Sequence, residues 1–162
     1  MNASWLAIAL LVLLCAGCAA PTALTPTTPP ATCIPTDQDR YAYRPARLQV
    51  LAPCTRVPGV VEATSLEADG DVHINVRLDD PYVAVLNGGN LFEGGDLVVE
   101  PVCQIPPPQA DAIRICASDP DPLAGPLPRV GDHVWMEGRQ VLDVQHHAWV
   151  ELHPLYRWGV LP

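Results

Sequence analysis

The sequence predicts a small all-β domain, an OB-like Greek-key barrel of about five strands with one or two short helical turns. The first observation is a series of short runs rich in β-branched residues, separated by turns rich in Gly and Asp. The second is a long Pro-rich connection between the third and fourth runs. Only residues 80–87 and 108–117 have a helical character, and both are brief. This pattern is typical of an OB-type barrel, and it also permits an open β-sandwich.

The first two runs lie in "RVPGVVEATSLEADGDVHINVRLDD", where the acidic, Gly-containing turn indicates a β-hairpin. In the second run apolar and polar residues alternate, so one face is expected to be core. The inward set is Val72, Ile74, Val76 and Leu78, and the outward set is His73, Asn75 and Arg77. The turn at residues 67–71 lacks the twelve-residue ligand pattern of an EF-hand, so it predicts a turn rather than a calcium site.

Three further runs complete the predicted barrel. They are "DLVVEPVC" at residues 96–103, "HVWMEGRQVLDV" at 133–144 and "AWVELHP" at 148–154. Gly59 and Gly138 lie where such barrels bend or bulge their strands.

The fifth run is expected to close the barrel. Alternation turns Val150 and Leu152 towards the core. It leaves Trp149, Glu151 and His153 on the other face, with Glu151 and His153 exposed or paired across strands. Truncating a buried Leu152 to Ala would then cost about 2–5 kcal/mol, whereas His153→Ala would cost well under ~1 kcal/mol if His153 is a surface residue.

The N-terminus predicts export and a lipid anchor. Residues 1–17 form an apolar run that is too short for a spanning helix and is typical of a signal peptide. The tetrapeptide "CAGC" resembles the bacterial lipobox, which implies that Cys18 is lipidated and anchors the protein to the membrane. The alternatives are a plain secretory signal that is cleaved nearby and an uncleaved signal anchor. Residues 18–32 are rich in Pro and Thr and predict a disordered tether. The expected location is therefore the extracytoplasmic side of a bacterial cell envelope.

The remaining residues, 33–162, suit one domain that carries the formal net charge of −9. Such a surface repels phosphate backbones, which argues against nucleic acid as a partner. The aromatic residues make an envelope protein, peptide or carbohydrate easier to accommodate, and we expect a monomer.

Four cysteines follow the predicted lipidation site: Cys33, Cys54, Cys103 and Cys116. An even number in an oxidising compartment predicts two disulfides, with three possible connectivities. Cys103 and Cys116 flank a short irregular loop, and their pairing would stabilise the fold by about 3 kcal/mol. Cys33 would then pair with Cys54. A Cys-based metal site is the weaker alternative, because this part of the chain has no C-x-x-C pair.

A polar surface is expected beside the fifth run. In an OB-type barrel the fifth strand pairs with the third and the third with the second, which would bring several His and acidic side chains together. The candidate ligand or metal surface comprises His73, Glu100, Asp143, His147, Trp149, Glu151 and His153. Imidazole and carboxylate donors suit zinc or another divalent ion. The alternative is a set of cross-strand polar pairs, and His146 is expected to be solvent-exposed.

The segments "ADGDVHINVRLD", "DLVVEPVC" and "VGDHVWMEGRQVLDVQHHAWVELHP" together resemble an uncharacterised group of exported bacterial proteins. The last strand of that group reads approximately D-x-x-H-G-W-x-E-I-H-P, and Ala148 replaces the usual Gly. The resemblance spans roughly residues 54–156 and implies the fold and an exported location. With no nucleophile or phosphate-loop motif in the chain, we expect a non-enzymatic binding module. The alternative is a metal-dependent hydrolase or nuclease.

Overall fold

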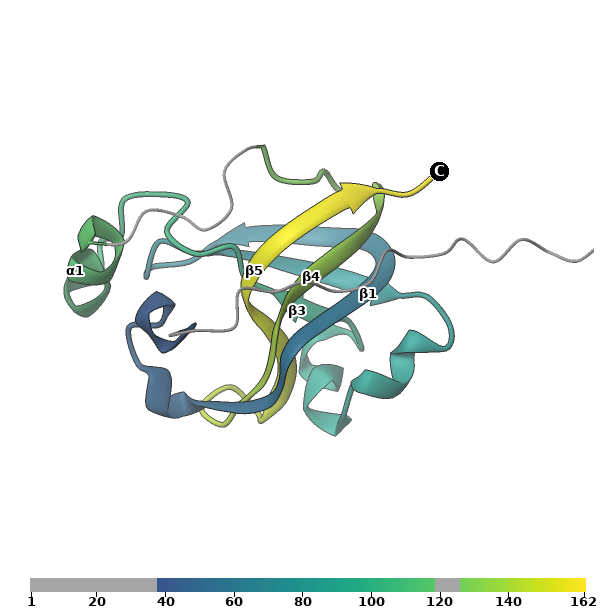
Figure 1. The fold of residues 1–162 in the computed structure, drawn as a ribbon, viewed down its shortest axis with the longest axis horizontal. Helices are drawn as coiled ribbons and strands as arrows, with labels where there is room; N and C mark the ends of the chain where they lie inside the picture. Colours follow the sequence, from purple (N-terminus) through teal and green to yellow (C-terminus); the bar gives the residue numbers. More distant parts are fainter. Residues whose placement is uncertain (1–37, 119–125) are drawn as a thin grey trace, which may run out of the picture.

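The computed structural model describes residues 38–118 and 126–162, and this part is mostly β-structure with short helices (Figure 1). The strands are β1 (Leu48–Leu66), β2 (Val72–Leu78), β3 (Leu97–Val99), β4 (His133–Asp143) and β5 (Trp149–Val160). The helix α1 covers Ala110–Ser118, and 3-10 turns cover η1 (Gln38–Tyr41), η2 (Pro45–Arg47), η3 (Tyr82–Val85) and η4 (Gly88–Glu93). The predicted signal peptide, Cys18, the tether and Cys33 lie outside the described residues. Within them, no helix has the length and apolar character needed to cross a membrane.

The five strands form one sheet whose pairings close into a barrel in the order β1-β2-β3-β5-β4. The long strand β1 pairs antiparallel with both β2 and β4, and β4 pairs antiparallel with β5. Strand β3 pairs antiparallel with β2 and parallel with β5. The all-β class and the expected pairings of the fifth strand with the third and the third with the second are confirmed.

The alternating residues of β2 and β5 supply much of the core. All four predicted inward residues of β2 are buried, whereas His73, Asn75 and Arg77 are not. Val150 and Leu152 are also buried, as predicted, and pack with Met136 of β4 and Leu97 of β3. Period-two alternation therefore identified the inward face of both strands correctly.

Two glycines allow strands to approach closely. The β4–β5 register shifts on both sides of Gly138, and a Cβ added there would lie 2.6 Å from the carbonyl oxygen of Pro154. A Cβ on Gly59 would lie 2.5 Å from the carbonyl oxygen of Arg77. Gly138 therefore sits at the predicted irregularity, and Gly59 serves close contact between β1 and β2.

The helical segments and one disulfide match expectation. The turn η3 falls within the first segment with helical character, and helix α1 overlaps the second and ends one residue beyond it. The turn η4 was not predicted and occupies a segment expected to be Gly-rich turns. Cys103 and Cys116 are joined, with their Cα atoms 5.3 Å apart. Cys54 is also disulfide-bonded, and its predicted partner Cys33 lies outside the described residues.

The second face of β5 differs from the expectation. Trp149 is 6% exposed, and Glu151 and His153 are fully buried, so the exposed alternative is wrong for this face. The other alternative, pairing across strands, is seen for His153 with Glu100. Two segments cover this face of β5. The segment before β1 and the segment after β3, including α1, lie on the same side of the barrel (Figure 1). The small cost that exposure implied for His153→Ala therefore does not apply, because a buried polar network surrounds this histidine.

Candidate functional site

A pocket of about 190 Å³ lies between the barrel and the segment that precedes β1. Its aromatic walls are Tyr43, His73, His146 and Trp149. The ring of Trp149 stacks on His146 with centroids 5.2 Å apart and lies 5.6 Å from the ring of His73. Strands β2 and β5 thus present two of the four rings, and the covering segment supplies Tyr43.

The same pocket is acidic. Glu67 and Asp69 come from the turn between β1 and β2, and Glu100 directly follows β3. The carboxylate of Glu67 lies 3.8 Å from Nδ1 of His73, and that of Glu100 lies 3.8 Å from Nε2. Arg47 also lines the pocket, but its guanidinium is bound to Asp143.

Beneath Glu100 is a buried cluster formed with Asp71 and His153. Nε2 of His153 lies 3.2 Å from Oε2 of Glu100 and 3.6 Å from Oδ2 of Asp71. The parallel pairing of Val99 with Leu152 places Glu100 beside His153, and backbone hydrogen bonds continue this pairing past Glu100. The sheet register therefore holds the two side chains together.

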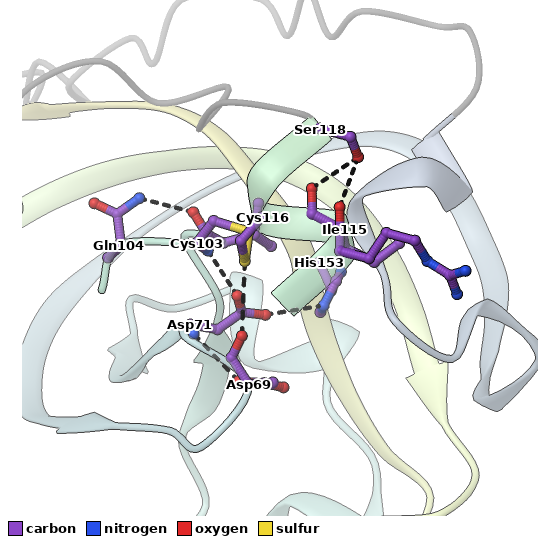
Figure 2. The surroundings of a disulfide bond; sticks show 10 residues. Asp69, Asp71, Cys103, Gln104, Ile115, Cys116, Ser118 and His153 are labelled. Atoms are coloured by element: carbon purple, nitrogen blue, oxygen red, sulfur yellow. Dashed lines mark hydrogen bonds and ion pairs between the residues drawn. A yellow bond between two sulfur atoms is a disulfide. The ribbon is translucent and has the colours of Figure 1, made fainter. Parts of the chain in front are cut away.

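Asp71 is oriented by the disulfide loop. Its Oδ1 accepts a 2.7 Å hydrogen bond from the backbone N–H of Cys103, which leaves Oδ2 towards His153 (Figure 2). Cys116, the disulfide partner of Cys103, comes from α1. The predicted disulfide thus fixes one acidic side chain of the cluster.

The remaining predicted residues have separate roles. Asp143 ends β4, pairs with Arg47 and accepts backbone hydrogen bonds from Gln145 and His146, so it organises the turn before β5. Glu151 is buried and accepts a 2.7 Å hydrogen bond from Nε1 of Trp149.

His147 is exposed and stacks on Phe92 with ring centroids 3.8 Å apart. It does not line the pocket. Its neighbour His146, expected to be solvent-exposed, keeps 48% of its side chain exposed but pairs with Asp143 and stacks on Trp149.

Burial disfavours the charged form of several side chains at the site. Burial and the neighbouring Glu151 and Asp71 hold the pKa of Glu100 well above its usual value of 4.5. Burial also raises the pKa of Asp69, with a further contribution from Asp71. Burial lowers the pKa of His73, so the neutral imidazole is favoured.

The raised pKa of Glu100 predicts a pH dependence of stability. The folded protein retains this proton to a higher pH than the unfolded chain does, so stability is lost as the pH rises above about 4.5, by up to ~1.4 kcal/mol per pH unit. In Glu100→Gln this loss is expected to be smaller, because no charge forms at that position. Denaturant titrations between about pH 5 and 8, in buffer with chelator, would measure it.

Glu62→Gln is the control for this comparison, because Glu62 is an exposed partner of Arg77. It should keep the pH profile of the unmodified protein. Identical profiles for Glu100→Gln and the unmodified protein would contradict the prediction.

Several contributors were missed from the sequence. Glu67, Asp69 and Asp71 were interpreted only as turn residues, and Arg47 and Tyr43 precede the first recognised run. All of them reach the site through tertiary packing of the turn and the covering segment. The acidic turn "EADGD" was the available signal, because it leads into the strand that carries His73.

The fold and site define a five-stranded all-β barrel domain with an acidic, aromatic-lined pocket beside it. Comparison with known proteins finds no family model, no curated protein and no solved structure that matches the chain.

Proposed function

We propose that this protein is a lipid-anchored, extracytoplasmic, non-enzymatic binding module that takes an ammonium group of an envelope peptide or protein into the pocket beside Trp149. The observation that carries the proposal is the composition of the pocket, which combines aromatic rings with three carboxylates. A cation near an aromatic face is stabilised by about 0.5–2 kcal/mol. The exposed carboxylate of Glu67 adds charge complementarity, which favours cationic over anionic ligands.

The size of the pocket supports a small group rather than a whole ligand. Its volume of about 190 Å³ is below the range of roughly 300–1,000 Å³ that is usual for drug-sized molecules. An ammonium group at the end of an alkyl chain, as in a lysine side chain, is compatible with this volume and with the acidic walls.

The strand order supports assignment of the barrel to the OB type. In OB-type barrels the first strand pairs with both the second and the fourth, and the third lies beside the fifth. The pairings of β1 with β2 and β4, and of β3 with β5, follow this scheme. The resemblance to exported bacterial proteins supports the same assignment and an envelope location.

Butylammonium, butyrate and butanol test the proposed binding, because they share an alkyl chain and differ in charge. In NMR titrations with chelator present, butylammonium is expected to shift the indole N–H resonance of Trp149 saturably, and the other two are not. Glu67→Gln should weaken binding up to about fivefold, since an exposed carboxylate contributes about 0.2–1 kcal/mol.

Glu62→Gln is the matched control, because the side chains of Glu62 and Glu67 are both 42% exposed and Glu62 does not line the pocket. It should bind butylammonium as the unmodified protein does. Equal binding of butanol, or no binding of butylammonium, would disprove the cationic-ligand proposal.

The lipid anchor has its own test. Cys18 supplies the thiol that the lipobox assigns to acylation, so Cys18→Ser is expected to move the protein from the membrane fraction to the soluble or secreted fraction. Cell fractionation with immunoblotting measures the change. Retention of Cys18→Ser in the membrane fraction would argue for an uncleaved signal anchor instead.

A further inference from the structure

We propose that Asp71, Glu100 and His153 form a binding site for a divalent transition-metal ion, with zinc as the best match. One imidazole nitrogen of His153 and one carboxylate oxygen from each of Asp71 and Glu100 lie within 4.8 Å of one another. Two ligand atoms bound tetrahedrally to one zinc ion at about 2.0–2.1 Å lie roughly 3.3 Å apart. The separations of 3.2 and 3.6 Å from Nε2 of His153 match this spacing.

The buried histidine is a second, independent observation. The side chain of His153 is fully buried, yet neither Nδ1 nor Nε2 makes a hydrogen bond. Oε2 of Glu100, the oxygen nearest Nε2, is also buried without a hydrogen bond. Buried polar atoms are ordinarily hydrogen-bonded, because leaving one unsatisfied costs about 1–3 kcal/mol. A metal ion bound between Nε2 of His153 and Oε2 of Glu100 would satisfy these two atoms.

The charge around the cluster also favours a cation. Glu151 and Asp69 add two carboxylates to those of Asp71 and Glu100, and both contribute to the electrostatics of Glu100. Arg47 brings one positive charge near the cluster, 3.9 Å from Glu100, but its closest partner is Asp143. A divalent ion would balance much of the remaining negative charge.

Hydrogen bonds from residues outside the cluster fix the proposed ligands in place. The backbone N–H of Cys103 fixes Oδ1 of Asp71, and the disulfide to Cys116 anchors that part of the chain (Figure 2). Nε of Arg139 donates to the carbonyl oxygen of His153 at 2.9 Å. Outer contacts of this kind orient metal ligands and raise their affinity.

The donor set indicates the class of metal. Imidazole suits zinc and other transition metals, whereas calcium and magnesium prefer oxygen donors alone. The third ligand residue, Glu100, also lines the pocket, so water could complete the coordination from that side. The inference goes beyond the proposed binding of an ammonium ligand and does not depend on it.

Zinc titration of the full-length protein tests the inference. After removal of metal with a chelator, isothermal titration calorimetry without any organic ligand is expected to show one equivalent of bound Zn²⁺. Asp71→Asn and His153→Gln should each weaken binding at least tenfold, because each removes one metal ligand. No stoichiometric binding, or full affinity in both variants, would overturn the site.

The pair His133 and Asp79 provides the matched control, with Nε2 and Oδ2 2.8 Å apart and both side chains 34% exposed. His133→Gln should leave Zn²⁺ affinity unchanged, and loss of binding in this variant would overturn the assignment.

If the buried variants do not fold, crystals of the unmodified protein soaked in Zn²⁺ test the proposed metal site. An anomalous peak within about 2.3 Å of Asp71, Glu100 and His153 is expected, and a peak elsewhere alone would overturn it. Failure of zinc binding with intact butylammonium binding would refute only the metal site, and the converse result would refute only the ammonium pocket.

Discussion

Replacement of Arg47 by Met is expected to lower the free energy of unfolding by about 3–5 kcal/mol. The guanidinium side chain is only 2% exposed and pairs with the fully buried carboxylate of Asp143. It also lies 3.9 Å from the carboxylate of Glu100. Met fills a similar volume without a charge, so the variant leaves both carboxylates buried without their cation. Chemical denaturation of the two proteins at neutral pH would measure the loss.

Arg44→Met is the control for this prediction. Arg44 makes the same type of pair, with Asp111, but the two side chains are 57% and 42% exposed. Water replaces that interaction readily, so little change in stability is expected. An equal loss in the two variants would mean that burial of the Arg47 pair is not the source of its effect.

Truncation of Leu152 to Ala is expected to cost about 2–5 kcal/mol. Leu152 is fully buried in the barrel core, where β5 pairs with both β3 and β4. The substitution removes apolar contacts and leaves a cavity that the surrounding strands cannot fill completely. Thermal or denaturant unfolding gives the difference directly.

Leu91→Ala makes the same chemical change at a site that is 75% exposed. Its effect should stay within about 0.5 kcal/mol. If Leu152→Ala lost no more stability than Leu91→Ala, the assigned register of β5 would be wrong.

The inward faces of the strands were predictable because of local chemistry. Alternation in β2 and β5 identified Val76 and Leu152 as core, and the Pro-rich loop between Cys103 and Cys116 indicated their disulfide. Apolar side chains at every second position leave one arrangement that buries them all. These features depend on neighbouring residues, which a sequence displays directly.

The outer face of β5 was not predictable from the same pattern. Alternation places Glu151 and His153 opposite the core, but it contains no information on what covers that face. The segment carrying Arg47 and the loop after β3 provide the cover, and both are distant in sequence from β5. These two segments therefore form a second buried layer on the outer face of β5, where solvent was expected.

The same packing decides which residues of the candidate surface meet. The strand pairing brings Glu100 and His153 together, as expected, whereas His147 stacks on Phe92 outside the pocket. Asp71 joins the cluster because the disulfide loop orients its carboxylate.

The sequence by itself determined the all-β class, the core-facing residues and the Cys103–Cys116 pair, because each depends on short-range alternation or spacing. Only the tertiary structure decided that Asp71, Glu100 and His153 share a buried cluster. The physical reason is that burial and charge compensation depend on which distant segments pack together, here the turn before β2, the end of β3 and the middle of β5.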